Sequence, residues 1–119
     1  MRQETIDNER DKLKAFLKAD IQVVRRHRRS RGSAKLAVTK YGKDLGLDEA
    51  EQVKEATAQN TLVVSDDTKA NGLLTMTDAL IAENIEALAK AGYQIKPEQI
   101  FDMSLIKEVY EEDPTLKRA

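Results

Sequence analysis

The amino-acid sequence predicts a mainly α-helical chain. Apolar residues recur at three- and four-residue spacing in two segments, 9–24 and 78–91, which is the period of an amphipathic helix. The β-branched and apolar run at 62–64 is too short to predict a strand. With 119 residues, the chain has the length of one domain.

The first predicted helix covers 9–24. Asn8 is a suitable N-cap, and Glu9 and Asp11 lie in the first turn, where acidic side chains favour the helix dipole. The apolar stripe is formed by Leu13, Phe16, Leu17, Ile21 and Val24. We expect this stripe to contact the core, and we expect the helix to end at Arg25, where a solvated basic loop begins.

Two shorter helices are predicted next. Ser33 can cap a helix that carries Leu36, Ala37 and Tyr41 and ends at the breaker Gly42. Asp48 and Glu51 then form the start of a third helix, in a pattern similar to a capping box, through about residue 59. Its apolar face is thin, so we expect it on the surface.

The second half of the chain predicts a loop and three more helical segments. Residues 65–72 are polar and rich in turn-forming residues, which favours a loop. Thr77 or Asp78 starts the fourth helix, and Gly92 suits the left-handed position that ends it. We expect core contacts from its apolar stripe, Leu80, Ile81, Ile85 and Leu88. Short helices follow near 97–101 and 104–111.

The composition removes several classes of function. The chain has no cysteine, so disulfides and thiolate chemistry are absent, and its net charge of −1 gives no overall attraction to nucleic acid. No stretch approaches the roughly 20 apolar residues of a membrane span, so we expect no membrane insertion. The first residues lack the apolar centre of a signal peptide, so the chain as written would be cytoplasmic.

Catalytic and metal-binding patterns are scarce. The one histidine, His27, lies among arginines, and Asp66 with Asp67 lacks a further ligand at a suitable spacing. The acidic residues 111–113 suit a solvated helix end. We therefore expect neither an enzyme nor a metal site, and no phosphate-binding loop or other cofactor motif is present.

The sharpest local feature is the run RRHRRSR. Its arginines are Arg25, Arg26, Arg28, Arg29 and Arg31. Such a cluster could neutralise several phosphates, which makes a small helical nucleic-acid-binding protein an alternative hypothesis. No aromatic side chain is interleaved for base stacking, and a solvated basic loop explains the run equally well.

Several segments together resemble a known family. They are DKLKAFLKAD at 11–20, AKLAVTKYGKDLGLD at 34–48, NGLLTMTD at 71–78, AGY at 91–93 and FDMSLIKEVY at 101–110. In this order and spacing the segments are similar to the C-terminal end of the substrate-binding proteins of ABC importers in the nitrate, sulfonate and taurine group. The resemblance covers 6–118.

The resemblance implies a fold and a function for the complete protein of which this chain would be a part. The family has a two-lobed α/β periplasmic-binding-protein fold of type II, binds a small solute between its lobes and delivers the solute to an ABC permease from the periplasm. Residues 1–119 would then be a single partial domain, the C-terminal fragment, without the N-terminal lobe and most ligand contacts. We expect no solute binding by the fragment alone, and no ligand-binding residue can be assigned.

The match breaks at 23–32, although both flanks fit. The family usually continues the helix there and then turns, whereas this chain has the arginine run. We interpret 25–32 as an atypical arginine-rich insertion or a frame-shifted stretch in a disrupted receptor gene.

Overall fold

The structure, a computed structural model, describes residues 1–29 and 32–117, and no strand occurs within these two ranges. The α-helices are α1 (Gln3–Asn8), α2 (Arg10–Arg29), α3 (Gly32–Leu36), α4 (Glu49–Val63), α5 (Asp66–Asn71), α6 (Asp78–Lys90) and α7 (Ser104–Glu112). A π-helical segment, η1 (Ala37–Tyr41), and three 3₁₀ turns, η2 (Lys43–Leu45), η3 (Pro97–Gln99) and η4 (Pro114–Lys117), lie between or after them. The prediction of a mainly α chain is confirmed.

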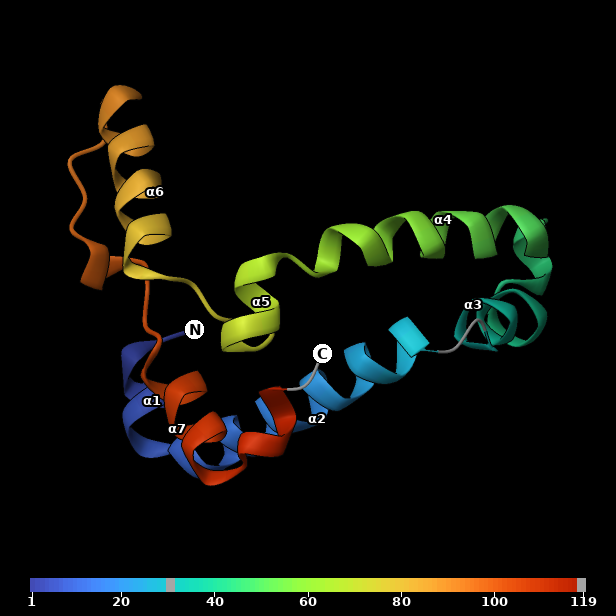
Figure 1. The fold of residues 1–119 in the computed structure, drawn as a ribbon, viewed down its shortest axis with the longest axis horizontal. Coiled ribbons are helices and arrows are strands. Elements are labelled where there is room, and N and C mark those ends of the chain that lie inside the picture. The colour runs from blue at the N-terminus through green and yellow to red at the C-terminus, as the bar shows by residue number, and fades with distance from the viewer. Residues whose placement is uncertain (30–31, 118–119) are drawn as a thin grey trace.

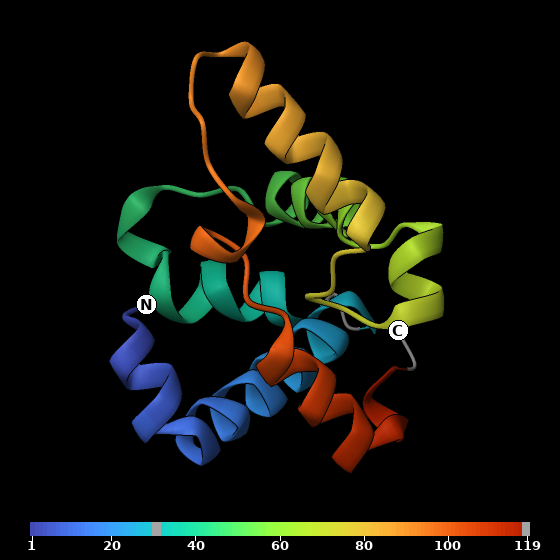
Figure 2. The same cartoon turned by 90° about the vertical axis from the view of Figure 1, so that its left-hand side faces the viewer.

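The body of the molecule is the pair α2 and α7, with η4 folded back against both (Figure 2). α7 lies across α2, and the two helices meet around a small apolar core. This core consists of Ile21, Ile106, Val109, Tyr110 and Leu116, with Leu17 and Met103 packed at its edge. The N-terminal and C-terminal ends of the chain therefore fold together, which no local pattern in the sequence requires.

A ladder of ion pairs closes the edge of this core. The Arg10 guanidinium donates from Nε to Glu108 Oε1 at 2.9 Å and from Nη2 to the Ser104 hydroxyl at 2.9 Å. Glu112 accepts from both Lys14 (2.6 Å) and Lys18 (2.8 Å). The ladder fixes how the two helices are aligned, because basic groups one turn apart on α2 meet acidic groups one turn apart on α7.

Two hairpin arms extend from the body (Figure 1). The first arm runs from α3 through η1 to α4, and its elements pack mainly on one another. The second arm is α6 with the return segment through η3, which is the main packing partner of α6. Neither arm shares the core of the α2–α7 body, so the chain has several small packing centres instead of one.

The molecule is open for its size. Its radius of gyration is 17.5 Å, whereas a compact domain of this length has about 13.5 Å. Its accessible surface is 8824 Å², whereas a compact monomer of this mass has about 6,500 Å². The chain therefore exposes about 2,300 Å² more than compact packing would leave.

Helix α1 was not predicted from the sequence, and three further segments differ from the prediction. α2 does not end before the arginine run but continues to Arg29, because nothing in the run breaks a helix. α4 continues to Val63, so the apolar run at 62–64 is mostly helical. The loop expected at 65–72 is wrong: α5 forms there, with Ser65 and Thr68 making a reciprocal capping box.

The predicted caps are confirmed at the starts of α4 and α6. The prediction is wrong for Asn8, which is the last residue of α1, and for Ser33, which lies inside α3 instead of before it. The Asp48 carboxylate accepts from the backbone N–H of Glu51 at 2.9 Å, and the Thr77 hydroxyl accepts from the N–H of Leu80 at 3.2 Å. Gly92 has the left-handed backbone predicted for the end of α6. Local hydrogen bonding between near neighbours decides these positions, so the sequence is sufficient to find them.

The two apolar stripes are less buried than expected. On α2, Ile21 is fully buried, but Phe16 is 68% exposed. On α6 no residue is buried, and Ile81, Ile85 and Leu88 are only half covered. The expectation that both stripes contact a core is therefore wrong for Phe16, which is exposed, and for α6, whose stripe is only partly covered by the return segment through η3.

Candidate functional site

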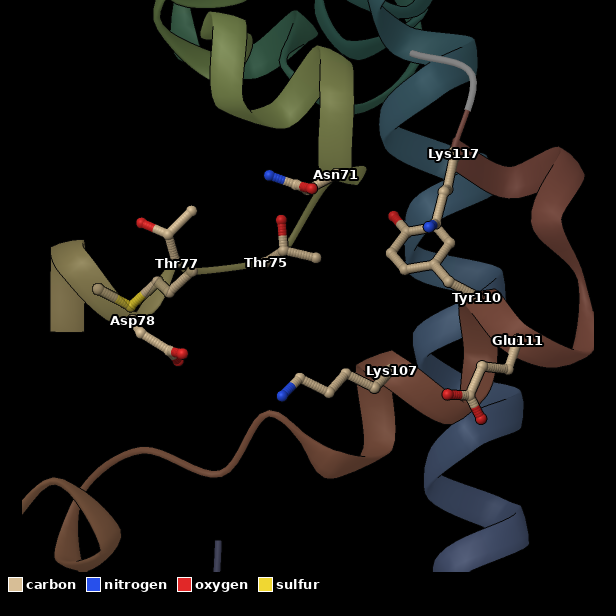
Figure 3. A pocket seen from close by; sticks show the side chains of 9 residues that line it. Asn71, Thr75, Thr77, Asp78, Lys107, Tyr110, Glu111 and Lys117 are labelled. Atoms are coloured by element: carbon tan, nitrogen blue, oxygen red, sulfur yellow. The ribbon is translucent and has the colours of Figure 1, made fainter.

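A pocket of about 450 Å³ lies where α6 joins the body (Figure 3). One wall is the connection from α5 to α6, and the opposite wall is α7 with η4. The lining residues are Asn71, Thr75, Met76, Thr77, Asp78, Lys107, Tyr110, Glu111 and Lys117. Its size is in the range of small-molecule sites, and most of the residues that line it have polar or charged side chains.

The pocket brings together charged side chains of both signs. Asp78 starts α6, Lys107 and Glu111 are one turn apart on α7, and Lys117 ends η4. None of these four groups forms an ion pair with another described residue. Lys117 instead lies over the Tyr110 ring, with Nζ 5.9 Å from the ring centroid. Such a lining can accept a small polar molecule with an anionic end and a cationic end.

Tyr110 fixes the wall of the pocket to the body. Its buried hydroxyl donates to the backbone oxygen of Leu73 at 2.8 Å, and burial raises the pKa of this phenol. Gly72 is also buried and has φ +99°, and a Cβ at Gly72 would lie 2.5 Å from Cζ of Tyr110. Leu74 has φ 63°, an unfavourable value for a branched side chain. The connection is thus held in a strained path by its contact with α7.

Sequence reasoning does not find this pocket. Lys107 and Glu111 have helical spacing, so their common face is predictable. Their approach to Asp78, on another element, depends on how the second arm leaves the body. The sequence contains no signal for that.

The arginine run is divided between two sides of α2. Arg25 and Arg28 are half-buried and continue the side of the helix that carries Leu17 and Ile21 toward α7 and η4. Arg25 donates from Nη1 to the backbone oxygen of Thr115 at 3.3 Å. Nε of Arg25 and Nε of Arg28 are buried and have no hydrogen-bond acceptor. The helix thus turns part of the run inward.

The remaining arginines have different positions. Arg26 is exposed on the outer side of α2. The side chain of Arg29, and the whole of Arg31, lie outside the described residues. The solvated loop expected for the run is not found at 25–29, which is helical. Arg26 is therefore exposed to solvent, whereas Arg25 and Arg28 are only partly exposed.

Other charged candidates have local roles. His27 is half-buried within α2. Asp66 pairs with Lys69 at 2.8 Å, which lowers the pKa of this carboxyl, and Asp67 accepts from the Asn71 amide at 2.6 Å. Both aspartates lie in the first turn of α5, where acidic side chains stabilise a helix. Among the described residues, no group of three or more His, Cys, Asp or Glu could hold a metal ion.

No described helix combines the length and apolar composition needed to cross a bilayer. Comparisons with known proteins add no relative: no family model, no curated protein and no solved structure matches the chain.

Proposed function

We propose that this chain is the C-terminal part of the substrate-binding component of an ABC importer for a small solute such as nitrate, a sulfonate or taurine. In this proposal the solute is held with the help of an N-terminal lobe that these residues do not include. The chain alone does not bind the solute with useful affinity, and it acts with the permease only as part of the complete receptor.

The observation that carries the proposal is the open packing of the arms. The apolar stripe of α6, including Ile81, Ile85 and Leu88, is only half covered by its own return segment. An amphipathic helix gains most of its stability by burying such a stripe against another element. A larger protein in which further segments cover α6 accounts for a stripe that this chain leaves incomplete.

The inward arginines support the frame-shift interpretation of 25–32. At a helix–helix contact, the positions of Arg25 and Arg28 ordinarily carry apolar side chains, as the preceding Leu17 and Ile21 do. Each buried Nε–H without an acceptor costs about 1–3 kcal/mol. A sequence that was not selected for this position would produce such a mismatch, while the flanking segments still pack normally.

The experiment is to sequence the gene from well upstream of Met1 through the codons for 23–33. The expected result is receptor coding sequence upstream, in a frame shifted relative to this chain. Clean reads that keep RRHRRSR in frame behind unrelated DNA would refute the frame-shift part of the proposal.

A second experiment, on the protein itself, tests the proposed solute class separately from the proposed fold. We expect that nitrate, taurine and methanesulfonate do not raise the thermal midpoint of the chain as it stands. The frame-restored full receptor, made as one polypeptide, should show a higher midpoint with at least one of them. A stably folded restored protein that responds to none would refute the solute class while leaving the fold assignment intact.

A further inference from the structure

Exposed apolar side chains are concentrated at the end of the first arm, where α3, η1 and η2 lie (Figure 1). They belong to Leu36, Tyr41, Leu45 and Leu47, on α3, η1, η2 and the turn before α4, and we call this set the corner patch. Tyr41 is 74% exposed and Leu45 is 73% exposed. No other stretch of this length among the described residues exposes as many large apolar side chains.

Backbone geometry holds the corner patch outward. The N–H of Gly42 donates to the oxygen of Ala37 at 2.6 Å, five residues back, so this turn is π-helical. Five-residue spacing in a π turn places Leu36 and Tyr41 on one side of the segment. On the inner side, Val38 and Ala34 are buried within the arm, whose helices α3 and α4 pack together. The inner contacts of the arm therefore fix which side chains point outward.

The turn after η1 is equally constrained. Gly46 adopts φ +64°, the left-handed conformation that reverses the chain between Leu45 and Leu47. Leu47 packs on Gly42 so closely that a Cβ there would lie 2.8 Å from Leu47 Cδ1. The backbone therefore holds Leu45 and Leu47 in defined positions at the surface.

The charges around the corner patch are balanced. Lys43 and Asp44 are exposed and form no ion pair with another described residue. Lys40 lies over the Tyr41 ring at 5.6 Å, and Asp48 caps α4. An apolar centre with equal numbers of basic and acidic groups at its margin can match a copy of itself, as a two-fold symmetric interface requires.

The surface area fits the same partner. The chain exposes 8824 Å², about 2,300 Å² more than a compact monomer of its mass. Obligate homodimers bury about 1,000–2,500 Å² on each subunit. This surplus belongs to the whole chain, of which the corner patch is one part, and its size matches what one subunit of an obligate homodimer buries.

We propose that the corner patch is the centre of a two-fold symmetric interface between two copies of this chain. Leu45 and Tyr41 of one copy pack against the same residues of the other, and Lys43 of each copy faces Asp44 of its partner. The proposal does not depend on the proposed receptor function, because the corner patch lies on the first arm and includes neither the α6 stripe nor a residue of the pocket.

The test is the molar mass in solution, measured by light scattering and sedimentation over a range of concentrations. We expect the mass to rise from 13.4 kDa toward twice that value with increasing concentration. Leu45→Glu and Tyr41→Glu should weaken association by roughly tenfold or more, since hot-spot side chains dominate such interfaces. Circular dichroism should show unchanged helix content, because both side chains are exposed.

Two controls make the interface specific. Leu62 is 85% exposed and lies at the C-terminal end of α4, at the opposite end of this helix from the corner patch. Leu62→Glu introduces the same charge there and should leave association unchanged. Lys43→Glu should weaken association, and the double variant Lys43→Glu with Asp44→Lys should restore it.

A wild-type chain that remains monomeric at millimolar concentration would overturn the proposal. Equal sensitivity to Leu62→Glu, or no recovery in the charge-reversed double variant, would do so as well.

Discussion

The hydroxyl of Tyr110 and the carbonyl of Leu73 form the hydrogen bond that ties the second arm to the body of the molecule. The bond is 2.8 Å long and buried, and it joins positions that are 37 residues apart in the chain. Around it, Gly72 approaches the Tyr110 ring more closely than any other residue type could. The direction in which α6 leaves the body therefore depends on one tyrosine and one glycine.

Replacing Tyr110 with phenylalanine should lower the free energy of unfolding by about 1–3 kcal/mol, because the Leu73 carbonyl would stay buried without a donor. Urea denaturation followed by circular dichroism measures this loss. Tyr93→Phe is the matched control, since Tyr93 is exposed and its loss of a hydroxyl should change stability little. Equal effects of the two substitutions would contradict the role assigned to the Tyr110 bond.

Gly72→Ala should destabilise the protein more than Gly46→Ala. Both glycines have positive φ, but a Cβ at Gly72 meets the Tyr110 ring, whereas a Cβ at Gly46 meets nothing within 4 Å. We expect a loss of about 2–4 kcal/mol at Gly72, from strain and overpacking together, and about 1 kcal/mol at Gly46 from strain alone. Thermal unfolding of the two variants compares them directly, and a reversed order would be inconsistent with the structure.

Acid should weaken the contact between α2 and α7. Hydrogen bonds from Lys14 and Lys18 lower the pKa of Glu112 from 4.5 to about 2. Because the folded-state pKa is depressed, the stabilisation is present above the unfolded pKa and is lost as the pH falls through the folded value. The urea midpoint of the wild type should therefore fall between about pH 5 and pH 2.

Glu112→Gln should show a smaller fall over that range, because one carboxyl with a depressed pKa is removed. Glu111→Gln is its neighbour and control, since Glu111 lines the pocket and forms no ion pair with a described residue. If the Glu112 variant kept the full pH dependence of the wild type, the ladder would not be the cause.

Arg25→Met should leave the thermal midpoint unchanged or raise it. The substitution keeps an unbranched apolar stem in the half-buried site and removes an Nε–H that has no acceptor, at the cost of one long hydrogen bond to Thr115. Arg26→Met on the exposed side is the control and should have little effect. A large loss of stability only in the Arg25 variant would show that the guanidinium supports the contact between α2 and η4.

The nucleic-acid hypothesis has its own test. With Arg25 and Arg28 half-buried and a net charge of −1, we expect no binding to a fluorescent DNA duplex at physiological salt, measured by anisotropy. The same holds for single-stranded RNA. Strong binding that weakens with added salt and disappears in Arg26→Ala would instead establish the arginine run as a phosphate-binding surface.

Part of the fold was predictable because its causes are local. The starts of α4 and α6 follow from Asp48 and Thr77, whose side chains bond to N–H groups three residues on. The loop prediction for 65–72 failed because Ser and Thr favour turns and helix caps alike, and here Ser65 and Thr68 start a helix. The arginine run was expected to end the first helix, yet arginine is a good helix former and α2 continues through it.

By itself, the sequence determined the helical class, most helix starts and the two amphipathic stripes, since these depend on residues within one or two turns of each other. Only the tertiary structure decided which stripes are buried. It placed Ile21 against α7, left Phe16 and α6 without a full cover, and turned Arg25 inward. It also brought Asp78 and Lys107 to one pocket. These outcomes depend on contacts between segments far apart in the chain, and helical periodicity specifies a face without specifying its partner.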